Sequence, residues 1–415
     1  MSGWIDHTIW WHVYPLGFAG APIRPTAEER ALSPRLDRLL PWLDYLIELG
    51  ANGLALGPIF QSESHGYDTV DFFRIDPRLG DDATFDRLAT ACRERGIHLM
   101  LDGVFNHVGT GHPLFQAALA GNDPDAEAMF RIHRTETGVH YDDFEGHQAL
   151  PALNHDSPVV VNRVADVMCH WLRRGASAWR LDAAYAVKPE FWARVLPRVR
   201  AEFPDVWIVG EVIHGDYPDI VRRSGMDSVT QYELWKAAWS SLLDGNFFEL
   251  DWCLKRHNNF LASFVPMTFI GNHDVTRIAS RIGNDKAALA ATVLFTVGGI
   301  PSIYYGDEQA FRGVKTDREG GDDEVRPAFP DTPSALSPLG EPMRRIHHDL
   351  IGLRRHNPWL VNATTTPVHL ENRTFAYDAI GREEGQRLHV SLRLDPSPMA
   401  DIHTADGTHL LHVGA

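Results

Sequence analysis

The stretch Gly175-Ala-Ser-Ala-Trp-Arg-Leu-Asp-Ala-Ala184 decides the fold of this chain. It begins at a glycine, which is typical of a helix end, and a small, apolar run from Ser177 to Leu181 then predicts a buried strand. Arg180 and Asp182 end this run, and the two-residue period of a strand places their side chains on one face. A buried Arg and Asp must satisfy each other or a ligand. Taken alone, the pair fits a structural ion pair and a functional site equally well.

Strands and helices alternate on both sides of this stretch. Apolar strands are predicted at residues 8–15, 52–60, 97–105, 177–181, 206–211, 228–234, 266–274 and 300–306, of which 228–234 is the weakest. Helices are predicted at residues 36–49, 85–94, 156–172, 191–199, 286–297 and 343–353. Buried strands that alternate with helices favour a parallel sheet, and eight such units predict an α/β fold of the (β/α)8 TIM-barrel type.

Two segments depart from this alternation. Residues 108–152 are rich in Gly, His, Asp and Phe without a clear period, and they predict a short, lid-like excursion after the third strand. Residues 359–415 contain short strand-like runs, such as 374–377 and 388–392, and predict a small antiparallel β C-terminal domain. The barrel itself is then expected to comprise residues 1–107 and 153–358.

Composition narrows the classes of partner. The 415 residues carry a formal charge of -16, which argues against nucleic acid or an anionic membrane and suits a neutral substrate. No apolar run is long enough to span a membrane, and the N-terminus has no signal-peptide pattern. Three widely spaced cysteines without a C-x-x-C motif favour a reducing compartment, so we expect a cytoplasmic protein. The scattered histidines form no metal-binding motif.

Carboxylates follow several of the predicted strands. Asp182, Glu211 and Asp274 follow the fourth, fifth and seventh strands, and His107 and His273 stand at comparable places. In a barrel these strand ends meet at one mouth, where such enzymes keep their active sites. Like charges gathered there raise the pKa of at least one carboxyl group, giving one ionised and one protonated member. Glycoside hydrolysis needs this combination of nucleophile and acid.

Seven motifs, in order, resemble those of glycoside hydrolase family 13, the α-amylase family. The resemblance covers residues 5–355 and is strongest to the cyclomaltodextrinase, neopullulanase and oligo-1,6-glucosidase groups. The main motifs are Asp102-Gly-Val-Phe-Asn-His107, Gly175 to Asp182, Gly210-Glu-Val212 and Phe269-Ile-Gly-Asn-His-Asp274. Supporting stretches lie at residues 53–68, 150–154 and 299–308.

The resemblance implies three catalytic carboxylates. Asp182 would attack the anomeric carbon, and Glu211 would protonate the departing oxygen and then deprotonate water. Asp274 would bind sugar hydroxyls more strongly as the oxocarbenium ion forms. The outcome is retention, which requires the two reacting carboxyl groups to lie about 5–5.5 Å apart.

The resemblance also implies a set of substrate-binding residues. Arg180 would keep Asp182 ionised and oriented, and the others are Tyr67, Asp68, His107, His273 and Arg326. Three of them have a structural alternative: Tyr67 as a core aromatic residue, His107 as a backbone contact, and Arg326 as a solvated or ion-paired loop residue.

Departures from the family pattern refine these expectations. The excursion is shorter than the second domain with which amylases hold calcium, and it lacks a dense Asp/Asn cluster, so we expect no cofactor and find calcium unsupported. We also expect no N-terminal module before the barrel, unlike the cyclomaltodextrinase and neopullulanase group. Ala183 stands where α-1,6-specific relatives have Val, which favours α-1,4 bonds.

The expected activity is that of a retaining α-glycoside hydrolase that acts on maltooligosaccharides or related α-glucans. One alternative is a transglycosylase, either a glucanotransferase or an isomerase, which uses the same intermediate. Another is a barrel that has lost catalysis and only binds, but the complete carboxylate set argues against it.

Overall fold

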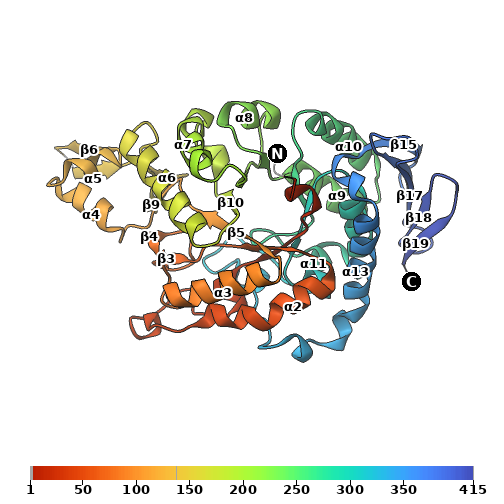
Figure 1. Ribbon diagram of the computed structural model, residues 1–415, viewed down its shortest axis with the longest axis horizontal. Helices are drawn as coiled ribbons and strands as arrows, with labels where there is room; N and C mark the ends of the chain where they lie inside the picture. Colours follow the sequence, from red (N-terminus) through yellow and green to blue (C-terminus); the bar gives the residue numbers. More distant parts are fainter. Residues whose placement is uncertain (1–2, 137, 415) are drawn as a thin grey trace. The chain divides into compact units, whose positions relative to one another are not determined.

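The computed structural model describes residues 3–136 and 138–414 (Figure 1). Its strands up to residue 229 are β1 (Trp10–Val13), β2 (Gly53–Leu56), β3 (Phe60–Ser62), β4 (Thr69–Ile75), β5 (His98–Gly103), β6 (Ile132–Thr135), β7 (Gly138–Tyr141), β8 (Asp143–Phe144), β9 (His147–Pro151), β10 (Ala178–Leu181), β11 (Trp207–Gly210) and β12 (Ser228–Val229). The later strands are β13 (Met267–Phe269), β14 (Ile300–Tyr304), β15 (Thr364–Leu370), β16 (Thr374–Ile380), β17 (Arg387–Arg393), β18 (Met399–Thr404) and β19 (His409–Gly414).

The helices follow most of the predicted segments. They are α1 (Pro15–Phe18), α2 (Leu40–Leu49), α3 (Asp82–Glu94), α4 (Pro113–Ala120), α5 (Pro124–Ala128), α6 (Pro158–Arg173), α7 (Pro189–Glu202), α8 (Tyr217–Ser224), α9 (Tyr232–Asp244), α10 (Phe248–Leu261), α11 (Ile278–Ile282), α12 (Asn284–Thr296) and α13 (Glu341–His356). A short 3-10 helix, η4 (Ala184–Ala186), follows β10.

The chain forms two compact units. One comprises residues 14–43 and 54–227, and its parallel strands run in the order β2, β5, β10 and β11. The other comprises the described residues of 1–13, 44–53 and 228–415; there β1 pairs with β14 and β14 with β13, and a parallel bridge joins Thr230 to Met267. The predicted fold class is confirmed, because parallel strands alternate with helices in both units, as in a (β/α)8 barrel.

Helix α6 brings the chain to the stretch that decides the fold. Pro158 opens the helix, and the hydroxyl of Ser157 accepts a hydrogen bond from the backbone N–H of Val159 at 3.2 Å. Gly175 after the helix adopts a φ of 112°, which a residue with a Cβ rarely adopts. The predicted start and stop of this helix are therefore both confirmed.

Aromatic residues pack against the face of β10 that lies opposite Arg180. Trp179 is fully buried and lies 5.7 Å from Phe105 and 6.2 Å from Phe60, measured between ring centroids. Because side chains alternate along a strand, burying Trp179 on this face directs Arg180 to the opposite one. Trp179 is one of several fully buried tryptophans, which are Trp10, Trp11, Trp42, Trp171, Trp179, Trp192 and Trp207.

The two irregular segments contain regular structure. Residues 108–152 hold α4, α5 and two antiparallel hairpins, β6–β7 and β8–β9, and Figure 1 shows α4, α5 and β6 side by side. Strands β15–β19 form one antiparallel sheet in sequence order, which contacts α10 and α12 (Figure 1). The predicted all-β nature of the C-terminal segment is confirmed.

Two details differ from the sequence-based expectation. The sixth strand, predicted over residues 228–234, is only two residues long, because Gln231 caps a helix there. Its side-chain oxygen accepts from the backbone N–H groups of Glu233 and Leu234, so residues 232–234 begin α9. The hairpin of β3 and β4 was also not predicted.

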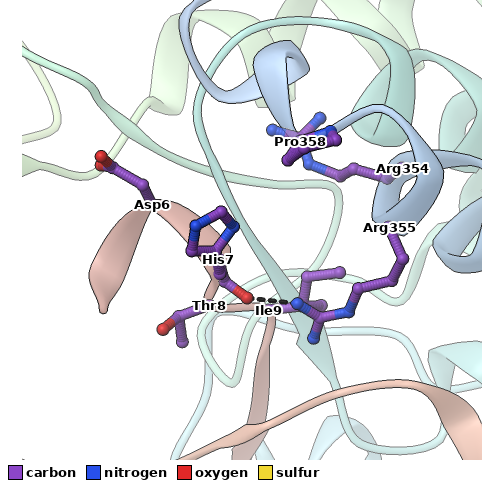
Figure 2. A pocket seen from close by; sticks show the side chains of 7 residues that line it. All are labelled: Asp6, His7, Thr8, Ile9, Arg354, Arg355 and Pro358. Carbon is purple, nitrogen blue, oxygen red and sulfur yellow. Dashed lines mark hydrogen bonds between the residues drawn. The ribbon is translucent and has the colours of Figure 1, made fainter. Parts of the chain in front are cut away.

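Two neighbouring arginines at the end of α13, Arg354 and Arg355, bind three other segments of the same unit. Figure 2 shows the small pocket that they line, together with Asp6, His7, Thr8, Ile9 and Pro358. Arg355 donates to the carbonyls of His7 and Gly50. Arg354 is buried and donates to three backbone carbonyls, those of Phe295, Val297 and Gly299, at 3.0, 2.9 and 2.6 Å.

Candidate functional site

One guanidinium group binds three carboxylates at the ends of β5, β10 and β11. Arg180 lies opposite Asp102 in the β5–β10 register, and its Nη1 donates to both oxygens of Asp102 at 2.8 and 2.7 Å. The same nitrogen donates to Oδ1 of Asp182 at 2.9 Å, and Nη2 lies 2.8 Å from Oε1 of Glu211. All four side chains are buried. Burial alone would lower the pKa of Arg180, but the carboxylates outweigh it and hold that pKa well above its usual value.

The backbone after Asp182 contributes further contacts. Ala183 has a φ of 44°, in the left-handed region that non-glycine residues rarely adopt. In this conformation its N–H donates to Oε2 of Glu211 at 3.0 Å. The N–H of Asp182 donates to the carbonyl of Gly103, and that of Glu211 to the carbonyl of Leu181. A strained residue is thus placed directly between two of the candidate catalytic groups.

Tyr67 and His107 lie beside this cluster. The hydroxyl of Tyr67 donates to Oδ2 of Asp102 at 3.2 Å, and Nε2 of His107 lies 2.9 Å from the carbonyl of Tyr67. A carbonyl only accepts, so Nε2 carries the proton, and the Nδ1 atom accepts from the side chain of Asn106 at 3.0 Å. Burial lowers the pKa of His107 to about 4, which keeps the ring neutral. The backbone contact considered for His107 is therefore present.

Asp68, the neighbour of Tyr67, is also buried. It accepts a hydrogen bond from the hydroxyl of Ser64 and lies 3.9 Å from Nε2 of His65.

His273, Asp274 and Arg326 form a second cluster, in the other unit, after β13. Oδ2 of Asp274 lies 3.0 Å from Nε2 of His273, and Oδ1 accepts from Nη2 of Arg326 at 2.9 Å. Nε of Arg326 donates to the carbonyl of His273 at 2.9 Å, and Nη2 also pairs with Asp322 at 3.1 Å. The ring of His12 meets that of His273 edge to face at 5.2 Å. The ion-paired alternative for Arg326 is therefore present, and its partner is a candidate catalytic carboxylate.

Sequence reasoning missed four residues beside the first cluster. Asp102 begins the motif at residues 102–107, but no role was predicted for it. Its place opposite Arg180 in the neighbouring strand could have indicated the ion pair. Phe144, Glu145 and Tyr185 carried no signal: Phe144 stacks on His107 with ring centroids 4.7 Å apart, and Tyr185 donates to Glu145 at 2.9 Å. Their placement depends on the fold of the excursion.

The described residues contain neither a metal-binding cluster nor a helix suited to a membrane. In residues 3–136 and 138–414, three or more His, Cys, Asp or Glu side chains are nowhere grouped so that they could hold a metal ion. Across the same residues, every helix is too short or too polar to cross a membrane.

Comparison with known proteins matches the chain to one family and to several individual proteins. The family described as "Alpha amylase, catalytic domain" matches residues 36–365. A cyclomaltodextrinase from Geobacillus thermopakistaniensis is 34% identical over 350 residues, covering 78% of this chain and 58% of the relative. The intracellular maltogenic amylase of Bacillus subtilis is 31% identical over 342 residues, covering 75% of this chain and 56% of the relative. The chain thus spans less than two thirds of the length of these relatives.

A solved structure extends the likeness over most of the chain. The cyclic α-maltosyl-(1→6)-maltose hydrolase of Arthrobacter globiformis, in complex with that sugar, has a TM-score of 0.80 and 26% identity. The match covers 94% of this chain and 91% of the hydrolase.

Proposed function

The chain belongs to the α-amylase family, and from this premise we propose that it is a retaining α-glycoside hydrolase. Its proposed substrates are maltooligosaccharides or cyclic α-glucans with α-1,4 bonds. The names of its relatives, cyclomaltodextrinase and maltogenic amylase, support an α-glucan substrate. The observation that carries the proposal is the single guanidinium of Arg180, which binds both Asp182 and Glu211.

In the first step, a carboxylate oxygen of Asp182 forms a bond to the anomeric carbon while the glycosidic C–O bond breaks. Glu211 gives its proton to the departing oxygen, and a β-linked glycosyl ester results. In the second step, Glu211 takes a proton from water, whose oxygen bonds to the anomeric carbon while the ester bond breaks. Two inversions return the α-anomer. Because one guanidinium binds both carboxylates, the two groups are close, which supports retention over inversion.

The remaining residues would hold the sugar at the point of cleavage. Asp274, oriented by His273 and Arg326, would bind hydroxyls that become more acidic in the transition state. Tyr67, oriented by Asp102, would offer its ring to the apolar face of the sugar.

We further propose the domain limits expected from the sequence: a barrel of residues 1–107 and 153–358, a lid of 108–152 and a C-terminal domain of 359–415. A cytoplasmic location is proposed as well. It is supported by three buried cysteines without disulfides and by the relative named as an intracellular enzyme.

Transglycosylation is the second candidate. It uses the same glycosyl ester, which a sugar hydroxyl attacks in place of water. The relatives named as hydrolases favour water as the acceptor.

A time course with maltotriose, panose and a cyclodextrin tests the proposal, with anomers followed by NMR. We expect the wild-type protein to release α-anomers, and Asp182→Asn to lose activity by at least about 10⁴-fold, as when a catalytic unit is broken. Products longer than the substrate would indicate transfer. Wild-type activity in Asp182→Asn would show that Asp182 is not the nucleophile.

A further inference from the structure

A buried arginine three residues after Asp274 binds the segment that carries Arg326. This residue, Arg277, is fully buried. Its Nη2 atom donates to the carbonyl of Val325 at 3.0 Å, and Val325 directly precedes Arg326 in the chain. Its Nη1 atom donates at 2.9 Å to the carbonyl of Tyr305, which follows β14. Because burying a charge is costly unless its donors are bound, these contacts tie the segment before Arg326 to the end of β14.

Two tyrosines at the end of β14 bind the backbone on both sides of Arg326. The hydroxyl of Tyr304 donates at 2.8 Å to the carbonyl that Arg277 also binds, and the hydroxyl of Tyr305 donates at 2.8 Å to the carbonyl of Pro327. The guanidinium of Arg277 lies 4.5 Å from the ring centroid of Tyr304, which adds a cation–π contact. The place of Arg326 is thus set by hydrogen bonds to the backbone of its two neighbours.

The carboxylate of Asp307 connects Arg277 to the motif that contains Asp274. Its Oδ1 atom accepts from Nη1 of Arg277 at 2.9 Å, and the side chain is buried. Its Oδ2 atom lies against Gly271, where an added Cβ would come within 2.1 Å of it. The glycine of this motif therefore permits a close approach that a larger residue would prevent. Arg277 is in this way connected to both segments that bring Asp274 and Arg326 together.

The ion pair of Asp274 and Arg326 depends on where these two segments lie. Nη2 of Arg326 donates to Oδ1 of Asp274, and Nε donates to the carbonyl of His273, each at 2.9 Å. A planar guanidinium that makes two hydrogen bonds at once must be held to within about 0.5 Å. A shift of the carbonyl of Val325 would therefore move Arg326 away from at least one of its partners.

We propose that Arg277 is a positioning residue for Asp274, which it orients by fixing the segment that carries Arg326. The inference rests on the proposed function, in which Asp274 binds sugar hydroxyls in the transition state. Because Arg277 is fully buried, it does not reach the sugar, and its effect passes through Arg326. Since the contacts of Asp274 strengthen in the transition state, misplacing it lowers kcat more than it changes KM.

The test compares Arg277→Lys with the matched control Arg354→Lys. Arg354 is another buried arginine of the same unit that donates to three backbone carbonyls, none of which belongs to the cluster of Asp274. Both variants should melt at a lower temperature, because an ammonium group cannot reproduce the fork of a guanidinium. In hydrolysis of maltotriose, Arg277→Lys should lower kcat about 10-fold to 100-fold, the effect of one lost charge-assisted hydrogen bond, and keep KM within about threefold. Arg354→Lys should keep the wild-type kcat.

Two further variants show whether the effect passes through Arg326. When Arg277→Lys is added to Arg326→Lys, kcat should fall by less than about twofold more, because the guanidinium that Arg277 places is already gone. Tyr304→Phe removes the other donor to the carbonyl of Val325 and leaves every charge in place. It should lower kcat about threefold to tenfold, as expected for one neutral hydrogen bond.

Several results would overturn the inference. A wild-type kcat in Arg277→Lys or in Tyr304→Phe would make the network structural only, and Tyr304→Phe decides alone if Arg277→Lys does not fold. An equal loss of kcat in Arg354→Lys would assign the effect to lowered stability. Multiplicative effects of the changes at Arg277 and Arg326 would show that the two residues act separately. Failure of the proposed function would look different, because the wild-type protein would then cleave no α-glucan at all.

Discussion

Replacing Arg180 with Lys tests whether one guanidinium organises the carboxylates. The positive charge is kept, but an ammonium group is compact and cannot reach Asp102, Asp182 and Glu211 from two nitrogens at once. At least two of the four contacts at 2.7–2.9 Å are lost. A hydrogen bond to a charged group contributes about 1.5–3 kcal/mol, so the loss amounts to about 3–6 kcal/mol. If this free energy is lost from the stabilisation of the transition state, kcat/KM decreases by about 10²–10⁴-fold.

The assay is steady-state hydrolysis of maltotriose, with the melting temperature measured in parallel. As a positioning residue, Arg180 should affect kcat more than KM, because it orients reacting groups and does not contact remote sugars. Arg87→Lys is the matched control, since Arg87 binds Asp37 through Nε and Nη2 at the surface. It should leave kcat unchanged. If Arg180→Lys melted at a lower temperature but kept kcat within about threefold of the wild-type value, the ion-pair network would be structural and the reasoning refuted.

Two further predictions concern stability. Burial raises the pKa of Glu308 to about 7, although the hydroxyl of Tyr45 donates a hydrogen bond to it at 3.0 Å. Because the folded pKa exceeds the unfolded value, the contribution of this group to the free energy of unfolding is complete below about pH 4.5. It is lost as the pH rises towards 7. Glu308→Gln should flatten this decline by up to about 3 kcal/mol in urea unfolding between pH 4.5 and 8, and parallel profiles of the two proteins would contradict it. Arg354→Met should leave three buried carbonyls without their donor and lower the free energy of unfolding by about 3–5 kcal/mol in urea titrations, whereas a loss below about 1 kcal/mol would show that water replaces the guanidinium.

The barrel could be predicted because its signals are local and repeated. The start of α6 at Ser157 and Pro158, its stop at Gly175 and the buried run of β10 are each readable from a few neighbouring residues. The length of the sixth strand was overestimated, because its end depends on a cap that the apolar pattern does not show. Its apolar residues continue into α9, and the cap by Gln231 is a local competition that hydrophobicity does not reveal.

The candidate site was predictable only where strand order determines it. Arg180 and Asp182 share a face by the period of the strand, and this pair was expected from the sequence. Predicting the contact of Asp102 with Arg180 would have required the register between β5 and β10, which a single sequence does not give. Glu145 and Tyr185 are forty residues apart and meet through the folding of an irregular segment, so no periodic pattern precedes their contact.

The backbone contacts around Asp182 hold the loop after β10 from two sides. After β10, the backbone N–H groups of Asp182, Ala183 and Tyr185 donate to Gly103 on one side and to Glu211 on the other. The loop after Asp182 is therefore held by β5 and β11, and these contacts maintain the left-handed conformation of Ala183. The β8–β9 hairpin meets the same region through the stack of Phe144 on His107 and the hydrogen bond of Glu145, and the carbonyl of Pro151 accepts from the N–H of Val108. Bond cleavage needs the groups around Asp182 to be rigid, and these contacts supply that rigidity.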